Sequence, residues 1–277
     1  MRLALVRHFW GVEASQGYER HESQWREVGY EMVEGTLRFS DNPEAMKRLL
    51  ARGEWPWIAQ VLTRDFEPGG TIRQHLDSLR QLIEESLPFS PVFVNAHSGA
   101  DSWSLNEAID FYGQALELEK ELGIAISHET HRLRCFGNPW MTRDVIQHYP
   151  DLKLTVDLSH WVCVCERLLP DFGDIIALVA KHAHHLHARV GFEEGPQVPD
   201  PRAPEWAGHL AAHEAWWDIL WKAQRQRNVA VSTLCPEFGP FPYMPTLPFS
   251  KEPVANLTEI CDWMGTRQKK RMEEVLR

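Results

Sequence analysis

The 277-residue sequence lacks long apolar runs and has few cysteines. No stretch of 18 apolar residues occurs, so no segment predicts a membrane span. Arg7 and His8 interrupt the apolar start after a few residues, which is too short for the centre of a signal peptide. The five cysteines are an odd number, and Cys163-Val164-Cys165 fits neither a secreted disulfide framework nor a Cys-x-x-Cys zinc ribbon. We therefore expect a cytoplasmic protein with reduced thiols that are not metal ligands.

An excess of basic charge is also missing. Lys plus Arg is 29 and Asp plus Glu is 39, which gives a formal net charge of −10. A protein that neutralises phosphates needs a basic surface, so the balance argues against nucleic acid as a partner. No glycine-rich phosphate loop is present, which favours an unphosphorylated small molecule. Apolar residues at 43% and charged residues at 25% are ordinary values for a globular protein with a large core.

The order of short apolar runs and amphipathic segments indicates the fold. Eight expected strands alternate with eight helical stretches, and such alternation requires parallel strands with helical crossovers. Eight units in about 250 residues predict a single-domain (β/α)8 TIM barrel over residues 1–277, whereas an open doubly wound sheet usually stops at five or six strands. The expected strands are 3–7, 30–34, 57–62, 91–95, 124–128, 152–156, 184–188 and 229–234.

Polar residues follow most of these strands. Active sites of such barrels lie at the carboxyl ends of the strands, so these side chains should surround one mouth. The strand-end residues are His8, Glu34, Gln60, Asn95, His97, His128, Glu129, Asp157, His160, His185, His187 and Glu237. Carboxylates that share a small cavity repel one another unless a cation lies between them. Oxygen ligands with one imidazole suit one divalent ion, with Mn²⁺ preferred and Mg²⁺, Co²⁺ or Zn²⁺ as alternatives.

Four segments resemble the metal-site segments of the xylose-isomerase-like TIM barrel superfamily, the sugar isomerases and epimerases. They are His128-Glu129-Thr130-His131-Arg132, Val156-Asp157-Leu158-Ser159-His160, His185-Leu186-His187-Ala188-Arg189 and Cys235-Pro236-Glu237-Phe238-Gly239. The resemblance implies Glu129, Asp157, His187 and Glu237 as metal ligands, with His185 as the other histidine considered for the metal. It also implies His160 as a substrate contact. Cys135 and Glu193 stand where ketose 3-epimerases have a carboxylate and an arginine that bind substrate, so Arg189 or Arg132 would take over that binding.

The resemblance implies a metal-dependent isomerase or epimerase for a sugar, keto-sugar or related polyhydroxy carbonyl compound. Glu129 and Glu237 would remove and return the proton of an enediolate mechanism. A lyase or dehydratase is the alternative on the same cluster, with His97 or His160 as the acid. An apurinic-endonuclease-like hydrolase, with His97 and Glu34 in a three-metal cluster, and a non-catalytic sugar-binding barrel complete the alternatives.

Tryptophans and loops supply the expected walls of the site. His97, Trp10 and Trp161 are the other expected substrate neighbours, and the proline-rich loop 191–204 is an expected wall or lid. Trp216, Trp217 and Trp221 have helical spacing and should pack between helix and barrel. The basic stretch 267–271 lies on an expected helix surface, where a contact in a homo-oligomer is the alternative role.

Overall fold

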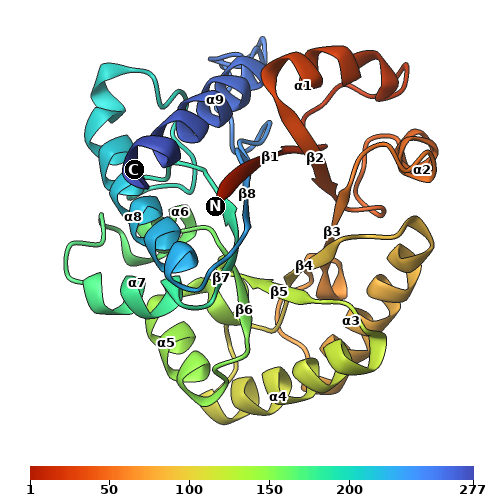
Figure 1. Cartoon of the computed structure of the whole chain (residues 1–277), viewed down its shortest axis with the longest axis vertical. Coiled ribbons are helices and arrows are strands. Elements are labelled where there is room, and N and C mark those ends of the chain that lie inside the picture. The colour runs from red at the N-terminus through yellow and green to blue at the C-terminus, as the bar shows by residue number, and fades with distance from the viewer.

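Eight parallel strands close into one barrel in the computed structural model, which describes residues 1–277. Each strand pairs with its sequence neighbours, and β1 pairs with β8, as Figure 1 shows. The predicted (β/α)8 barrel is therefore confirmed. The strands are β1 Arg2–His8, β2 Tyr30–Gly35, β3 Trp57–Leu62, β4 Phe93–His97, β5 Ile126–Glu129, β6 Lys153–Val156, β7 Ala183–His187 and β8 Val231–Cys235.

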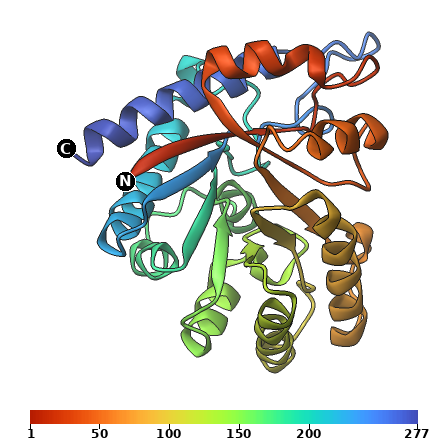
Figure 2. The same ribbon diagram turned by 45° about the vertical axis from the view of Figure 1, so that its right-hand side comes forward.

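The helices form a ring around the strands (Figures 1 and 2). In both views the chain ends lie close together, because Arg2 starts β1 and α9 packs against that strand. The helices are α1 Glu22–Val28, α2 Pro43–Ala51, α3 Ile72–Ser86, α4 Leu105–Leu122, α5 Pro139–His148, α6 Ser159–Cys165, α7 Gly173–Ala180, α8 Ala207–Gln226 and α9 Leu257–Val275.

Several element boundaries differ from the predicted ones. The strand expected at 91–95 is observed at Phe93–His97, because Ser90 is in a left-handed turn and Pro91 has no N–H to donate. The sequence pattern predicts a helix over 142–148, whereas α5 begins at Pro139, since the Asn138 side chain accepts a hydrogen bond from the Met141 N–H. The short helix α6 was not predicted.

Side chains inside the barrel change from apolar to polar along each strand. Successive side chains of a strand alternate between the two faces, so residues two apart share a face. Ala4 and Val6 of β1 belong to a small buried apolar cluster with Met32, Ile58 and Phe93. Two residues further along the same face come residues with polar side chains: His8, Glu34, Gln60 and Asn95. The barrel interior is therefore apolar at one end and polar at the carboxyl ends of the strands.

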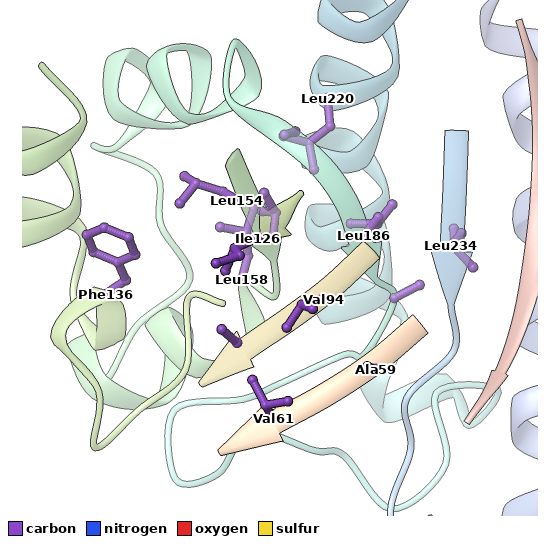
Figure 3. Close-up of a cluster of buried hydrophobic side chains, with 14 of the residues drawn as sticks. Ala59, Val61, Val94, Ile126, Phe136, Leu154, Leu158, Leu186, Leu220 and Leu234 are labelled. Carbon is purple, nitrogen blue, oxygen red and sulfur yellow. The ribbon is translucent and has the colours of Figure 1, made fainter. Parts of the chain in front are cut away.

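The other face of the strands builds the main core, between barrel and helices. Figure 3 shows part of this layer, with Val61, Val94, Leu154, Leu186 and Leu234 directed toward surrounding side chains. Burial of such side chains is the main favourable term in folding.

The three tryptophans of α8 pack between helix and barrel, as predicted. Trp217 and Trp221 are fully buried and Trp216 is 8% exposed, all in the main core. No helix of the structure is long and apolar enough to cross a membrane. All five cysteines are free thiols, and Cys163 and Cys165 are partly exposed at the end of α6.

Candidate metal centre

Four side chains from successive strand ends converge at the polar end of the barrel. Glu129 ends β5, Asp157 follows β6, His187 ends β7 and Glu237 lies two residues after β8. One ligand atom from each lies within 4.8 Å of the ligand atoms of the other three. All four residues are buried, with at most 3% of their surface exposed. We call this group the four-residue cluster; it consists of the residues that the sequence predicts as metal ligands.

His187 is oriented by Glu34, which lies deeper in the barrel. The Nε2–H of His187 donates to the Glu34 carboxylate, at 3.1 Å from Oε1 and 3.2 Å from Oε2. The Nδ1 atom then lies 3.0 Å from Oε2 of Glu237 and 3.5 Å from Oε2 of Glu129, with no hydrogen-bond partner. A carboxylate on the far nitrogen of a histidine is the usual support of a histidine that binds a metal.

His185 also contacts Glu34, but both of its ring nitrogens have protein partners. Its Nε2 lies 2.9 Å from Oε2 of Glu34, and its Nδ1 lies 2.7 Å from Oγ1 of Thr233. His185 therefore supports Glu34, whereas His187 has a nitrogen available to a ligand.

Glu129 is held by two neighbours through one of its oxygens. The Asn95 side chain donates to Oε2 at 2.8 Å, and Nε2 of His97 lies 2.6 Å from the same oxygen. The other oxygen, Oε1, is buried without a partner. A buried carboxylate oxygen without a donor is costly, so this atom is suited to receive a cation.

Asp157 is held by Arg189 and Ser159. Nη2 of Arg189 donates to Oδ2 at 2.5 Å, and the Ser159 hydroxyl and backbone N–H donate to Oδ1 at 2.5 and 3.0 Å. Burial raises the pKa of Asp157 even with this arginine beside it. Arg189 also donates to Nε2 of His160 at 2.7 Å, so His160 accepts a hydrogen bond there and is neutral.

Glu237 is the member of the four-residue cluster that lines the open cavity. Its Oε1 accepts from the Gln60 amide at 3.0 Å and lies 3.3 Å from Nε2 of His8. Burial opposes its charge, but His187 and Arg189 outweigh burial and lower the pKa of Glu237 to about 2. Glu237 is therefore ionised at neutral pH.

The four-residue cluster attracts positive charge. Burial disfavours a charged His187, but the carboxylates of Glu237, Glu34 and Glu129 raise the pKa of His187 well above its usual value. Together with the unpartnered Glu129 Oε1 and His187 Nδ1, this shows that the donor set fits a divalent cation. Two smaller groups, His97 with Glu129 and His131, and Glu34 with His187 and Cys235, have similar spacing, and each shares a residue with the four-residue cluster.

A cavity of about 300 Å³ opens beside the four-residue cluster. His97, Arg132, Arg189 and Trp10, four of the expected substrate neighbours, line it. The other lining residues are His8, Phe9, Gly35, Thr36, Phe39, Ser40, Asp41, Gln60, Leu62, Phe66, His131, Leu133, Glu237 and Tyr243.

Solved structures with the same fold were found, whereas no family model and no curated protein matches the sequence. A xylose isomerase-like TIM barrel protein from Mycobacterium smegmatis, in complex with magnesium, aligns over 100% of this chain and 98% of its own, with a TM-score of 0.61 and 15% identity. An L-ribulose 3-epimerase aligns over 100% of this chain and 98% of its own, with a TM-score of 0.61 and 13% identity. The probable 3-DHS dehydratase AsbF from Bacillus anthracis aligns over 97% of this chain and 99% of its own, with a TM-score of 0.60 and 14% identity.

This chain has the TIM barrel fold of these solved structures. The likeness concerns the architecture, and it covers nearly the whole length of both chains in each case. The similar proteins with this fold include an epimerase and a dehydratase by name, so the fold alone does not select a reaction.

Two expected substrate contacts lie away from the cavity. Trp161 is fully buried in the main core, where its Nε1–H donates to the Phe136 carbonyl at 2.9 Å, so its prediction as a substrate neighbour is wrong. Its position on α6 directs the ring toward the core instead. His160 is also fully buried and is absent from the cavity lining; it contacts Arg189 and packs on His131, with ring centroids 4.0 Å apart.

The loop 191–204 contributes no cavity-lining residue, contrary to expectation. Gln197 instead exchanges two hydrogen bonds with the backbone of Gly239, at 2.7 and 3.1 Å. A Cβ atom at Gly239 would lie 2.1 Å from the Trp10 ring, so this backbone segment supports a tryptophan that lines the cavity. The loop therefore acts on the cavity only indirectly.

Sequence reasoning gave no role to several residues that line the cavity, among them His131, Phe66 and Tyr243. His131 lies two residues after Glu129, and its ring stacks on His97 with centroids 4.4 Å apart. The two-residue spacing from Glu129 is a signal that could have identified it. Phe66 ends the irregular 3-10 turn Thr63–Phe66, and Tyr243 lies on a loop; in neither place does a periodic pattern indicate the direction of a side chain.

Proposed function

We propose that this protein is a divalent-metal-dependent isomerase or epimerase of small polyhydroxy carbonyl compounds. The convergence of Glu129, Asp157, His187 and Glu237 beside a cavity is the observation that carries the proposal. These four residues would hold the ion through three carboxylates and one imidazole, a set that suits Mn²⁺ or Mg²⁺. A bound ion would supply Lewis-acid stabilisation of negative charge on a substrate oxygen.

Glu237 is the base that this geometry offers to a substrate. It is ionised, it lines the cavity, and Gln60 and His8 fix one of its oxygens. Glu237 would take the proton from the carbon next to the carbonyl group. Glu129 contacts His97, which lines the cavity, and Glu129 would return the proton to that carbon or to its neighbour.

A lyase that eliminates water is the second candidate. It would use the same proton abstraction and would need an acid facing the leaving hydroxyl group. His97, which lines the cavity and whose Nε2 lies 2.6 Å from Oε2 of Glu129, is the observation that favours it. The dehydratase among the structures with this fold is consistent with it.

Metal analysis and solvent-deuterium exchange test the proposal. One ion per chain is expected, whereas three ions would favour an endonuclease-like cluster. Keto-sugars incubated in D₂O with the metal-loaded protein should gain deuterium at the carbon beside the carbonyl. Glu237→Gln should abolish exchange. The control Glu252→Gln changes an exposed glutamate in the loop after β8 and should leave exchange unchanged. The absence of a bound ion, or exchange unchanged in Glu237→Gln, would contradict the proposal.

A further inference from the structure

Two arginines line the cavity, and their surroundings differ. Arg189 is fully buried and bonded to Asp157, Ser159 and His160. Arg132 is partly buried and forms neither a salt bridge nor a side-chain hydrogen bond. Arg189 is therefore committed to the four-residue cluster, whereas the guanidinium of Arg132 is free to bind an anion.

Tyr243 holds both guanidinium groups in place. The Cζ atom of Arg132 lies 5.1 Å from the centre of the Tyr243 ring, and that of Arg189 lies 5.0 Å from it. Trp10 packs edge-on against the same ring, with centroids 5.0 Å apart. An aromatic face attracts a cation but satisfies none of its N–H donors. Arg132 is thus positioned at the cavity with its five donors unused.

Part of the cavity wall is apolar and aromatic. Phe66 contacts Phe39, with ring centroids 6.1 Å apart, and Leu133 follows Arg132 in the chain. All three apolar side chains line the cavity although they are 41 to 54% exposed. Phe66 and the two residues before it have positive φ angles of 70, 50 and 58°, a conformation that places this ring at the cavity against the usual backbone preference. A bare polyol has no apolar surface that could cover the exposed parts of these side chains.

We propose that the substrate carries a carboxylate group, bound by Arg132, next to an apolar portion that packs on Phe66. The inference rests on the proposed function for the other end of the molecule, where the four-residue cluster holds the reacting oxygens. One guanidinium matches one carboxylate through two parallel hydrogen bonds. A phosphate dianion would need more positive charge, and the same cavity is lined by the acidic side chains of Asp41 and Glu237.

Calorimetric binding of benzoate to the metal-free protein tests this site without the ion. In the presence of a chelator, benzoate should bind at least tenfold more tightly than benzamide, which lacks the charge, and than acetate, which lacks the ring. Arg132→Gln should weaken benzoate binding roughly tenfold or more and leave benzamide unchanged. Arg132→Lys should retain an intermediate affinity because it keeps the charge but loses the two parallel hydrogen bonds. Phe66→Ala should reduce the advantage of benzoate over acetate.

The matched control is Arg73→Gln, which changes a 90% exposed side chain on α3 and should bind benzoate as the unchanged protein does. Equal binding of benzoate and benzamide, or benzoate binding unaffected by Arg132→Gln, would overturn the proposal. Tighter binding of phenyl phosphate than of benzoate would overturn the carboxylate assignment. Because the chelator removes the ion, these outcomes are separate from those of metal analysis and deuterium exchange, which test the proposed function.

Discussion

The Nε2 atom of His187 lies 3.1 Å from Oε1 of Glu34, and this contact decides which nitrogen faces the four-residue cluster. Glu34 is ionised, because His187 and His185 outweigh its burial and hold the pKa of Glu34 well below the usual value. The carboxylate therefore accepts the Nε2–H and leaves the Nδ1 of His187 toward Glu129 and Glu237. Glu34 therefore orients His187, one of the four proposed ligands, without belonging to the four-residue cluster.

Replacing Glu34 by Gln should weaken divalent-metal binding by roughly 10–100-fold, the usual effect of removing a support of a metal-binding histidine. Titration with Mn²⁺ or Mg²⁺ followed by calorimetry measures the change. Glu31→Gln on the same strand is the control, because Glu31 is partly exposed and pairs with Lys269. Equal affinity of the Glu34→Gln and Glu31→Gln variants would show that Glu34 does not orient the ligand.

A chelator should lower the stability of the protein. An ion that binds only the folded chain, present at 100 times its dissociation constant, stabilises by about 2.7 kcal/mol. The free energies of unfolding measured in urea with Mn²⁺ and with excess chelator should differ by about this amount. The difference should become much smaller in Asp157→Asn, because a neutral amide oxygen is a weaker ligand than a carboxylate. A metal-dependent gain of the same size in that variant would count against Asp157 as a ligand.

Trp161→Phe should reduce stability without changing metal affinity. The substitution removes buried volume and the hydrogen bond to the Phe136 carbonyl, and we expect a loss of about 1–3 kcal/mol in the free energy of unfolding. The four-residue cluster does not contact this ring, so calorimetric metal titration should give the unchanged value. A large loss of metal affinity with unchanged stability would reverse this assignment.

The protein should lose stability between pH 6.5 and pH 4. Burial lowers the pKa of His213 to about 4, and its Nε2 accepts a hydrogen bond from the Gly191 N–H at 3.2 Å. Below pH 6.5 this histidine binds a proton in the unfolded chain but not in the folded chain. The free energy of unfolding therefore decreases as the pH falls from 6.5 toward 4. His128, with a pKa lowered by burial to about 3, acts in the same direction.

The size of the His213 contribution can be measured with His213→Gln. Between pH 7.5 and pH 5 this variant should lose about 2 kcal/mol less of its unfolding free energy than the unchanged protein, because glutamine does not titrate. Urea unfolding at the two pH values provides the comparison. The same pH-dependent loss in both proteins would show that His213 is not a source of the effect.

Most of the barrel could be predicted because local patterns repeat eight times. Apolar runs such as 57–62 indicate strands, and Asn42 with Pro43 indicates where a helix begins. The boundaries at Pro139 and Phe93 were missed because the capping of Asn138 and the turn at Ser90 decide them, and both depend on a few backbone angles.

The directions of loop and short-helix side chains could not be predicted. Trp161 is one residue after His160 on α6, and only the packing of that helix turns its ring into the core. The difference between Arg132 and Arg189 is equally invisible in the sequence, since both follow strand ends. It arises because Asp157 and His160 surround Arg189 and leave Arg132 without an acid.

The sequence by itself determined the eight strand–helix units and the polar residues at the strand ends, because alternation of side chains along a strand is a local property of the chain. Only the tertiary structure decided that Glu129, Asp157, His187 and Glu237 lie within 4.8 Å of one another, and which other side chains reach the cavity. That proximity requires β1 to pair with β8, a contact between the two ends of the chain that no local pattern contains.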